Sequence, residues 1–102
     1  MQQTLTALEN WTWYSFDLDN LSLVPEVSGV YCLGLNKNII YIGSSGNLHE
    51  RLTEHYYTSD PCIGQATHFA IEPCTNYKDR ERELLEWFRS KYHRLPECND
   101  RI

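Results

Sequence analysis

The sequence has no long hydrophobic run, few glycines and prolines, and no basic excess, and each absence excludes a class of protein. No apolar run approaches the roughly 20 residues that span a bilayer, so a transmembrane helix is excluded. With five glycines, four prolines and 41% hydrophobic residues among 102, the chain is neither fibrous nor disordered. The first residues lack the basic and apolar regions of a secretion signal, so we expect a cytoplasmic protein without a membrane partner.

Closely spaced cysteines are also missing. The nearest two of the four cysteines lie 12 positions apart, and none belongs to a Cys-x-x-Cys pair. Zinc ligands usually lie closer together in sequence, so this spacing argues against a zinc site. In a reducing compartment we expect free thiols rather than disulfides. The cysteines are Cys32, Cys62, Cys74 and Cys98.

The net charge of −5 argues against a protein that holds a polyanion through its overall charge. The acidity is uneven along the chain, however. The first 36 residues carry four acids and no base, whereas residues 61–102 carry seven charges of each sign. One face of the C-terminal part can therefore be positive, and weak intrinsic affinity for a polyanion is the expected consequence.

Residues 1–28 predict an irregular lead-in that packs on the rest of the chain. We interpret its aromatic residues as a cover for one side of the core, and a stacking platform for bases is the alternative. We expect residues 29–102 to form the domain itself, with one globular domain overall. The aromatic residues are Trp11, Trp13, Tyr14 and Phe16.

A β-hairpin is predicted by two β-branched and aromatic runs, residues 29–35 and 39–43. Asn36, at the start of the intervening segment, tolerates the positive φ that a short loop requires.

The register of this hairpin decides which side chains share a face. A three-residue loop symmetric about Lys37 places Tyr31 opposite Gly43. Tyr31 and Tyr41 then project from the same face of the sheet, one diagonal step apart.

A helix is predicted to begin after Asn47, because Asn47 and Glu50 resemble a capping box. Arg51 and His55 are i, i+4 neighbours on the flank of its apolar stripe, so we expect both at the seam between helix and sheet. The stripe consists of Leu48, Leu52 and Tyr56.

A third strand over residues 67–72 and a last helix over residues 77–94 complete the pattern. Glu81 falls on the apolar stripe of this helix, whereas Glu83 and Glu86 point the opposite way. A carboxylate on the core side of a helix is costly unless a cation pairs with it. Glu81 is therefore either a salt-bridged structural residue, or a metal ligand or catalytic group.

Several short motifs follow one another in a fixed order over about residues 29–99. They are Gly29-Val30-Tyr31, Tyr41-Ile42-Gly43, Asn47-Leu48, Arg51, His55, the helix with Glu81-x-x-Leu84-Leu85, and Pro96-Glu97-Cys98-Asn99. Each tripeptide alone is a weak signal, but their joint order and spacing resembles the GIY-YIG nuclease superfamily. The resemblance implies an α+β fold, in which a small three-stranded antiparallel sheet is flanked by helices.

The resemblance also implies an activity, namely a metal-dependent endonuclease that hydrolyses phosphodiester bonds, of DNA in preference to RNA. It implies one divalent ion, Mg²⁺ or Mn²⁺, with Glu81 as the ligand. Glu86 is the competing alignment, and we prefer Glu81 because only Glu81 shares the apolar face. Targeting by a partner protein or by a homodimer is expected, given the acidic charge.

Three positions carry the expected chemistry. By resemblance Tyr31 is the general base, Tyr41 orients the water or the phosphate, and Arg51 neutralises phosphate oxygens. A tyrosine, with a pKa near 10, is a poor base at neutral pH unless a nearby cation favours its phenolate. Arg suits phosphate because its fork donates two parallel hydrogen bonds.

Three further positions support them. By resemblance His55 is an auxiliary acid or base or a phosphate contact, Gly43 allows close backbone packing next to the substrate, and Asn99 supports the site. The main alternative is a catalytically inactive module of the same fold that binds nucleic acid or protein. A zinc or redox domain built on the scattered cysteines and histidines is a weaker one.

Overall fold

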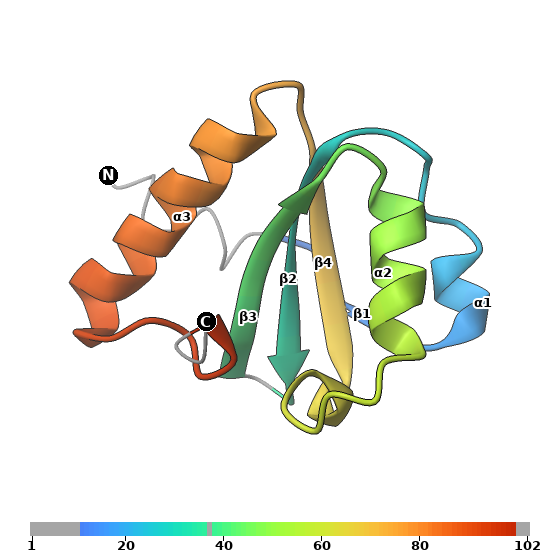
Figure 1. Ribbon diagram of the computed structural model, residues 1–102, viewed down its shortest axis with the longest axis horizontal. Coiled ribbons are helices and arrows are strands. Elements are labelled where there is room, and N and C mark those ends of the chain that lie inside the picture. Colours follow the sequence, from blue (N-terminus) through green and yellow to red (C-terminus); the bar gives the residue numbers. More distant parts are fainter. Residues whose placement is uncertain (1–10, 37, 100–102) are drawn as a thin grey trace.

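A computed structural model of the protein describes residues 11–36 and 38–99, which form a four-stranded antiparallel sheet with helices on both faces (Figure 1). The strand order is β1-β4-β2-β3, so β3 is an edge strand. The strands are β1 (Tyr14–Ser15), β2 (Gly29–Leu35), β3 (Asn38–Ser45) and β4 (His68–Pro73).

The helices are divided between the two faces of this sheet: α1 and α2 lie on one side and α3 on the other (Figure 1). No helix within the described ranges has both the length and the apolar character that a bilayer crossing requires. The helices are α1 (Leu18–Leu21), α2 (Leu48–Tyr56) and α3 (Tyr77–Tyr92), with a 3₁₀ turn η2 (Ile63–Gln65) before β4.

The expected α+β architecture is confirmed, but the expected number of strands is wrong. The additional strand, β1, lies in the segment interpreted as an irregular lead-in, where Tyr14 pairs with Phe69 and Ser15 with His68. Two residues are too few to display the alternation that marks a strand in a sequence. Residues 1–10 of the lead-in lie outside the described residues.

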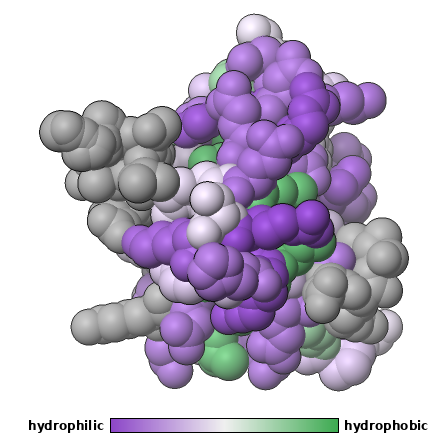
Figure 2. All heavy atoms as spheres, turned by 90° about the vertical axis from the view of Figure 1, so that its left-hand side faces the viewer, coloured by the Kyte–Doolittle hydropathy of each residue, from purple (hydrophilic) through white to green (hydrophobic). Residues whose placement is uncertain are grey.

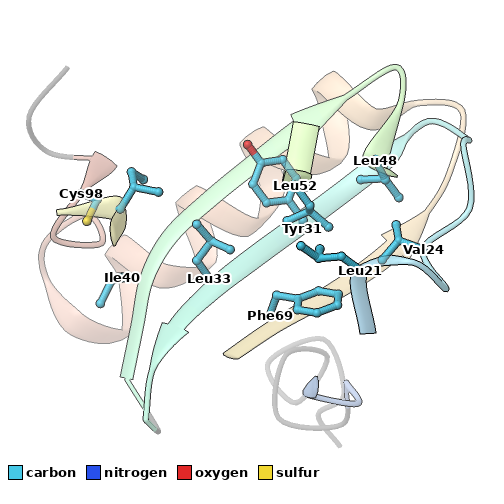
Figure 3. Close-up of a cluster of buried hydrophobic side chains, with 10 residues drawn as sticks. Leu21, Val24, Tyr31, Leu33, Ile40, Leu48, Leu52, Phe69 and Cys98 are labelled. Atoms are coloured by element: carbon cyan, nitrogen blue, oxygen red, sulfur yellow. The ribbon is translucent and has the colours of Figure 1, made fainter. Parts of the chain in front are cut away.

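Each face of the sheet has its own core because successive strand residues point to opposite sides. Tyr31 and Leu33 pack with Leu52 of α2 on one face, whereas Cys32 packs with Phe88 of α3 on the other. Figure 3 shows the first cluster. Within it, the hydroxyl of Tyr31 points away from Phe69.

The β2–β3 register places Tyr31 opposite Gly43, as expected. The loop is shorter than expected, because Leu35 already pairs with Asn38. A register shift between Leu33 and Gly34 compensates for the missing loop residue. The pairing at Tyr31 and Tyr41 is therefore the expected one, although the expected loop length is wrong. Lys37, the expected centre of the loop, lies outside the described residues.

The expectation of four free thiols is wrong. Cys62 and Cys98 form a disulfide across 36 positions of sequence, with their Cα atoms 5.8 Å apart. Only Cys32 and Cys74 carry free thiols. The pair has no local spacing signal, because tertiary structure brings the segment before η2 beside the chain that follows α3.

Candidate active site

The phenol of Tyr31 crosses directly over Gly43 on the neighbouring strand. A Cβ atom on Gly43 would lie 2.5 Å from the Tyr31 oxygen and 2.9 Å from a ring carbon of Tyr41. Real Cβ atoms do not approach other atoms so closely, so only glycine leaves space for both rings. The close packing at Gly43 is thus between its backbone and the rings of the two tyrosines.

His55 completes a cluster of three rings on the α2 face of the sheet. Its Nε2 lies 2.8 Å from the phenol oxygen of Tyr31, within hydrogen-bond distance. The ring centroid of Tyr41 lies 6.1 Å from that of Tyr31 and 5.6 Å from that of His55. Strands β2 and β3 thus supply the two phenols, and the flank of α2 supplies the imidazole.

Arg51 lies one helical turn before His55 and is more exposed than the three rings. Its side chain is 44% exposed, and its Nε lies 3.3 Å from Glu54 in a surface ion pair. Its charge nevertheless acts on Tyr31 and lowers the pKa of that phenol. The guanidinium is thus partly exposed, yet close enough to Tyr31 for its charge to act on the phenol.

Tyr31 is not a phenolate activated by a neighbouring cation, because its hydroxyl and the imidazole of His55 are both neutral. Burial and the neighbouring Tyr41 raise the pKa of Tyr31, and the opposing effect of Arg51 does not compensate. Burial, followed by the charge of Arg51, lowers the pKa of His55. At neutral pH the hydrogen-bonded pair is therefore a neutral phenol and a neutral imidazole.

Glu81 comes from α3, on the opposite face of the sheet from the phenols. It is half-buried, and its Oε1 accepts a hydrogen bond from the hydroxyl of Ser44 on the edge strand β3. After burial, Glu81 is the largest cause that raises the pKa of Tyr41, and it also raises that of Tyr31. The carboxylate and the phenols thus interact electrostatically across the edge strand, although they do not share one pocket.

A groove of about 600 Å³ runs beside Glu81 along α3. Glu86, the alternative metal ligand, lines the same groove but is exposed and has no part in the bond to Ser44. Of the two acids Glu81 is partly buried and Glu86 is exposed, and the choice of Glu81 as the metal ligand stays a prediction.

Asn99 acts on the site through the backbone of β3. Its Oδ1 accepts from the Ile42 N–H at 2.8 Å, and its Nδ2 donates to the Ile42 carbonyl at 2.9 Å. The preceding residue, Cys98, donates its N–H to Ile40 at 2.8 Å. The C-terminal segment thus pairs with the open edge of β3 at Ile40 and Ile42, on either side of Tyr41.

Two residues near the site were given no role in the sequence analysis. Ser44 follows the second tripeptide, and strand alternation alone places its side chain on the α3 face, toward Glu81. Asp60 begins the turn before η2, where its Oδ1 accepts from the N–H of Cys62 at 2.8 Å. The charge of Asp60 raises the pKa of both Tyr41 and His55, but an Asp-Pro turn carries no specific signal of such proximity.

The donor set near Glu81 fits a hard divalent ion. Among the described residues, no group of three His, Cys, Asp or Glu side chains could enclose a metal. Magnesium does not need such a cage, since it usually keeps several waters and binds through one or two carboxylates plus substrate phosphates. A single carboxylate oriented by the Ser44 hydroxyl, beside an open groove, suits this mode of binding.

Residues 29–101 match the model of the T5orf172 domain. The chain belongs to the T5orf172 domain family. This domain has a GIY-YIG-like nuclease fold, so the resemblance to that superfamily is confirmed. Among curated proteins there is no match to this chain.

Solved structures similar to this T5orf172 domain include the GIY-YIG N-terminal endonuclease domain of UvrC from Thermotoga maritima bound to magnesium. The two share 22% identity over 95% of this chain and 97% of that chain, with a TM-score of 0.59. A variant of that domain with an asparagine replaced by alanine, bound to its catalytic divalent cation, shares 21% identity over 95% and 96%, with a TM-score of 0.59. At this identity the likeness shows a nuclease fold.

Proposed function

We propose that this T5orf172 domain is a divalent-metal-dependent endonuclease that hydrolyses phosphodiester bonds, with DNA as the preferred substrate. The observation that carries the proposal is the neutral Tyr31–His55 pair, hydrogen-bonded at 2.8 Å beside Tyr41. The UvrC domain, which shares the fold, is an endonuclease domain bound to a catalytic divalent cation. The net charge of −5 favours weak intrinsic affinity, with targeting by a partner protein or a homodimer.

The pair can move a proton without a free phenolate. In the proposed step the attacking water gives a proton to the oxygen of Tyr31, and the phenol gives its own proton to Nε2 of His55. This requires the His55 tautomer with the proton on Nδ1, and a neutral imidazole whose pKa is lowered by burial is available for that role. His55 is thus the final proton acceptor, and Tyr31 is the relay that touches the water.

Arg51 and Tyr41 act on the phosphate. The guanidinium is partly exposed and can donate two parallel hydrogen bonds to non-bridging oxygens. Charge-assisted donors of this kind strengthen as negative charge develops on the phosphate. The phenol of Tyr41, whose ring lies next to that of Tyr31, orients the water or the phosphate.

Glu81 is the proposed ligand of the divalent ion, Mg²⁺ or Mn²⁺, and Ser44 fixes the orientation of its carboxylate. When bound, such an ion supplies Lewis-acid stabilisation of the phosphate oxygens and of the leaving oxygen. Gly43 leaves space beside the two phenols, and Asn99 holds β3 in register.

A second function is favoured by one observation. Glu81 lies on the opposite face of the sheet from the phenols, and the groove beside it is not lined by them. A binding module of the same fold, without catalysis, would tolerate that separation. Such a module binds nucleic acid or protein equally well after Tyr31→Phe or after addition of a chelator.

Cleavage by the purified full chain separates the two functions. We expect nicking of plasmid, branched or single-stranded DNA with Mg²⁺ or Mn²⁺, slower cleavage of RNA, and loss of both with EDTA. Glu81→Ala should abolish cutting, whereas Glu83→Ala, an exposed acid on the same helix, should leave cutting unchanged. Loss of cutting in Glu86→Ala but not in Glu81→Ala would transfer the ligand role to Glu86. No cleavage of any of these substrates with either metal would contradict the nuclease.

A further inference from the structure

Helix α3, with five basic and four acidic residues, does not share the net negative charge of the chain, part of which lies on the other face of the sheet. Asp17 caps α1 and Asp19 lies within it, on the side of the sheet opposite α3 (Figure 1). These acids belong to the N-terminal part of the chain, which carries most of the negative charge. The net charge of −5 therefore does not describe the α3 side of the molecule.

Three cations line the groove that contains Glu81. Lys78, Arg82 and Arg89 recur at i, i+4 and i+11, which places them along one flank of α3. All three are exposed, and the side chain of Arg82, which forms a surface ion pair with Asp79 at 2.6 Å, is 63% exposed. Figure 2, which views the α3 side, shows a largely hydrophilic surface there.

We propose that this groove, which we name the α3 track, binds the phosphodiester backbone of the nucleic acid and guides it past Glu81. The inference rests on the proposed function and adds where its substrate lies. Lys78 and Arg89 are separated by about 16 Å along the helix axis, from a rise of about 1.5 Å per residue. That length corresponds to about five phosphates on one strand of a duplex.

The position of Glu81 selects a nucleic acid over an acidic peptide as the occupant. Glu81 lies between Lys78 and Arg82 in sequence and lines the same groove. A phosphate held by these cations is therefore held beside the proposed metal ligand. An acidic peptide would gain from the same cations, but the cleavage proposed for this domain requires a phosphodiester beside Glu81.

Glu86 opposes the three cations within the α3 track. It is exposed and lines the groove, so its charge repels a phosphate backbone. We expect this arrangement to give weak, salt-sensitive binding. Glu86→Gln should tighten binding, whereas loss of Arg82 or Arg89 should weaken it.

Fluorescence anisotropy with labelled single-stranded and duplex DNA, in EDTA to prevent cutting, tests the α3 track over a series of salt concentrations. Arg82→Gln and Arg89→Gln should each weaken binding to duplex by about eightfold at about 0.1 M salt and reduce the salt slope by about 0.9, the value for one lost phosphate contact. Lys91→Gln is the matched control, because Lys91 lies on the same helix but over the rings of Trp87 and Tyr92. It should change neither quantity.

The outcomes separate this inference from the nuclease proposal. If cleavage occurs while Arg82→Gln and Arg89→Gln bind like the parent, or no more weakly than Lys91→Gln, the α3 track is overturned and the nuclease stands. If both variants lose binding but the parent cuts nothing, the α3 track stands and the nuclease is overturned. Binding of an Asp/Glu-rich peptide with the same dependence on Arg82 and Arg89 as DNA, or absence of DNA binding at low salt, would overturn the α3 track.

Discussion

Tyr31 occupies the space that any side chain on Gly43 would need, since a Cβ there would stand 2.5 Å from the phenol oxygen. Gly43→Ala should therefore displace the phenol or the strand, and it should destabilise the fold by about 1–3 kcal/mol, as overpacking of cores does. A shift of the Tyr31 phenol by about 1 Å can cost about 100-fold in rate. Urea unfolding and DNA cleavage measure the two effects.

A matched glycine provides the control for Gly43→Ala. At Gly64, in the turn η2, an added Cβ would meet no atom within 4 Å. Gly64→Ala should leave cleavage unchanged and should shift stability by less than about 1 kcal/mol. Equal effects of the two substitutions on stability and cleavage would show that the close contact between Gly43 and Tyr31 does not cause them.

Asn99→Ala should reduce stability together with activity, because the side chain forms two hydrogen bonds to the backbone of Ile42. Leaving the buried groups of Ile42 without partners costs about 1–3 kcal/mol. Asn99→Asp keeps the acceptor but places a carboxylate oxygen against the Ile42 carbonyl, so it should destabilise the fold at least as much as Asn99→Ala in urea unfolding. A variant Asn99→Ala that unfolds like the parent yet does not cut DNA would instead assign Asn99 to the chemistry itself.

The site residues that the sequence predicted well are those whose relation is local. The expected register placed Tyr31 opposite Gly43, although the structure reaches this pairing through a shorter loop and a register shift, and helical periodicity placed His55 on the flank of α2. Asn47 caps α2 as its spacing predicts, with its Oδ1 accepting from the N–H of Glu50 at 3.0 Å. Helical periodicity and helix capping depend only on residues that are close in sequence, so the sequence alone predicts them.

The features that the sequence did not predict depend on tertiary packing. Helical periodicity identified Glu81 as an acid on an apolar face, but not which side of the sheet that face would cover. The Cys62–Cys98 disulfide joins positions with no common motif. The pKa of Tyr31 also depends on complete burial, which outweighs the charge of Arg51 that the sequence emphasised.

The disulfide should hold the C-terminal segment, and through it Asn99, against β3. By loop-closure entropy, a cross-link over 36 residues stabilises the fold by about 4 kcal/mol. Cys62→Ser combined with Cys98→Ser, or treatment with a reductant, should lower the melting temperature. Cys74→Ser is the control, because its thiol is free. If non-reducing mass spectrometry shows four free thiols in oxidised protein, the disulfide is absent and this effect should vanish.

The last prediction concerns pH and the Tyr31–His55 pair. Burial and the charge of Arg51 lower the pKa of folded His55 below its ordinary value of about 6.5. Since the unfolded chain then binds the proton more readily, the contribution of His55 to stability is complete above about pH 6.5 and is lost as the pH falls through the folded-state pKa. The plot of kcat/KM against pH should fall on the acid side at a pH below about 6.5.

His55→Gln tests this assignment by both measurements. It should lower kcat/KM by about 100-fold or more, the usual contribution of a general base, and remove the acid limb from the residual rate. The difference in stability between parent and variant should change with pH only below about pH 6.5. His68→Gln, on β4 away from Tyr31, should retain the acid limb of the parent. An acid limb that persists in His55→Gln would mean that another group accepts the proton, and Tyr31 would then act without His55.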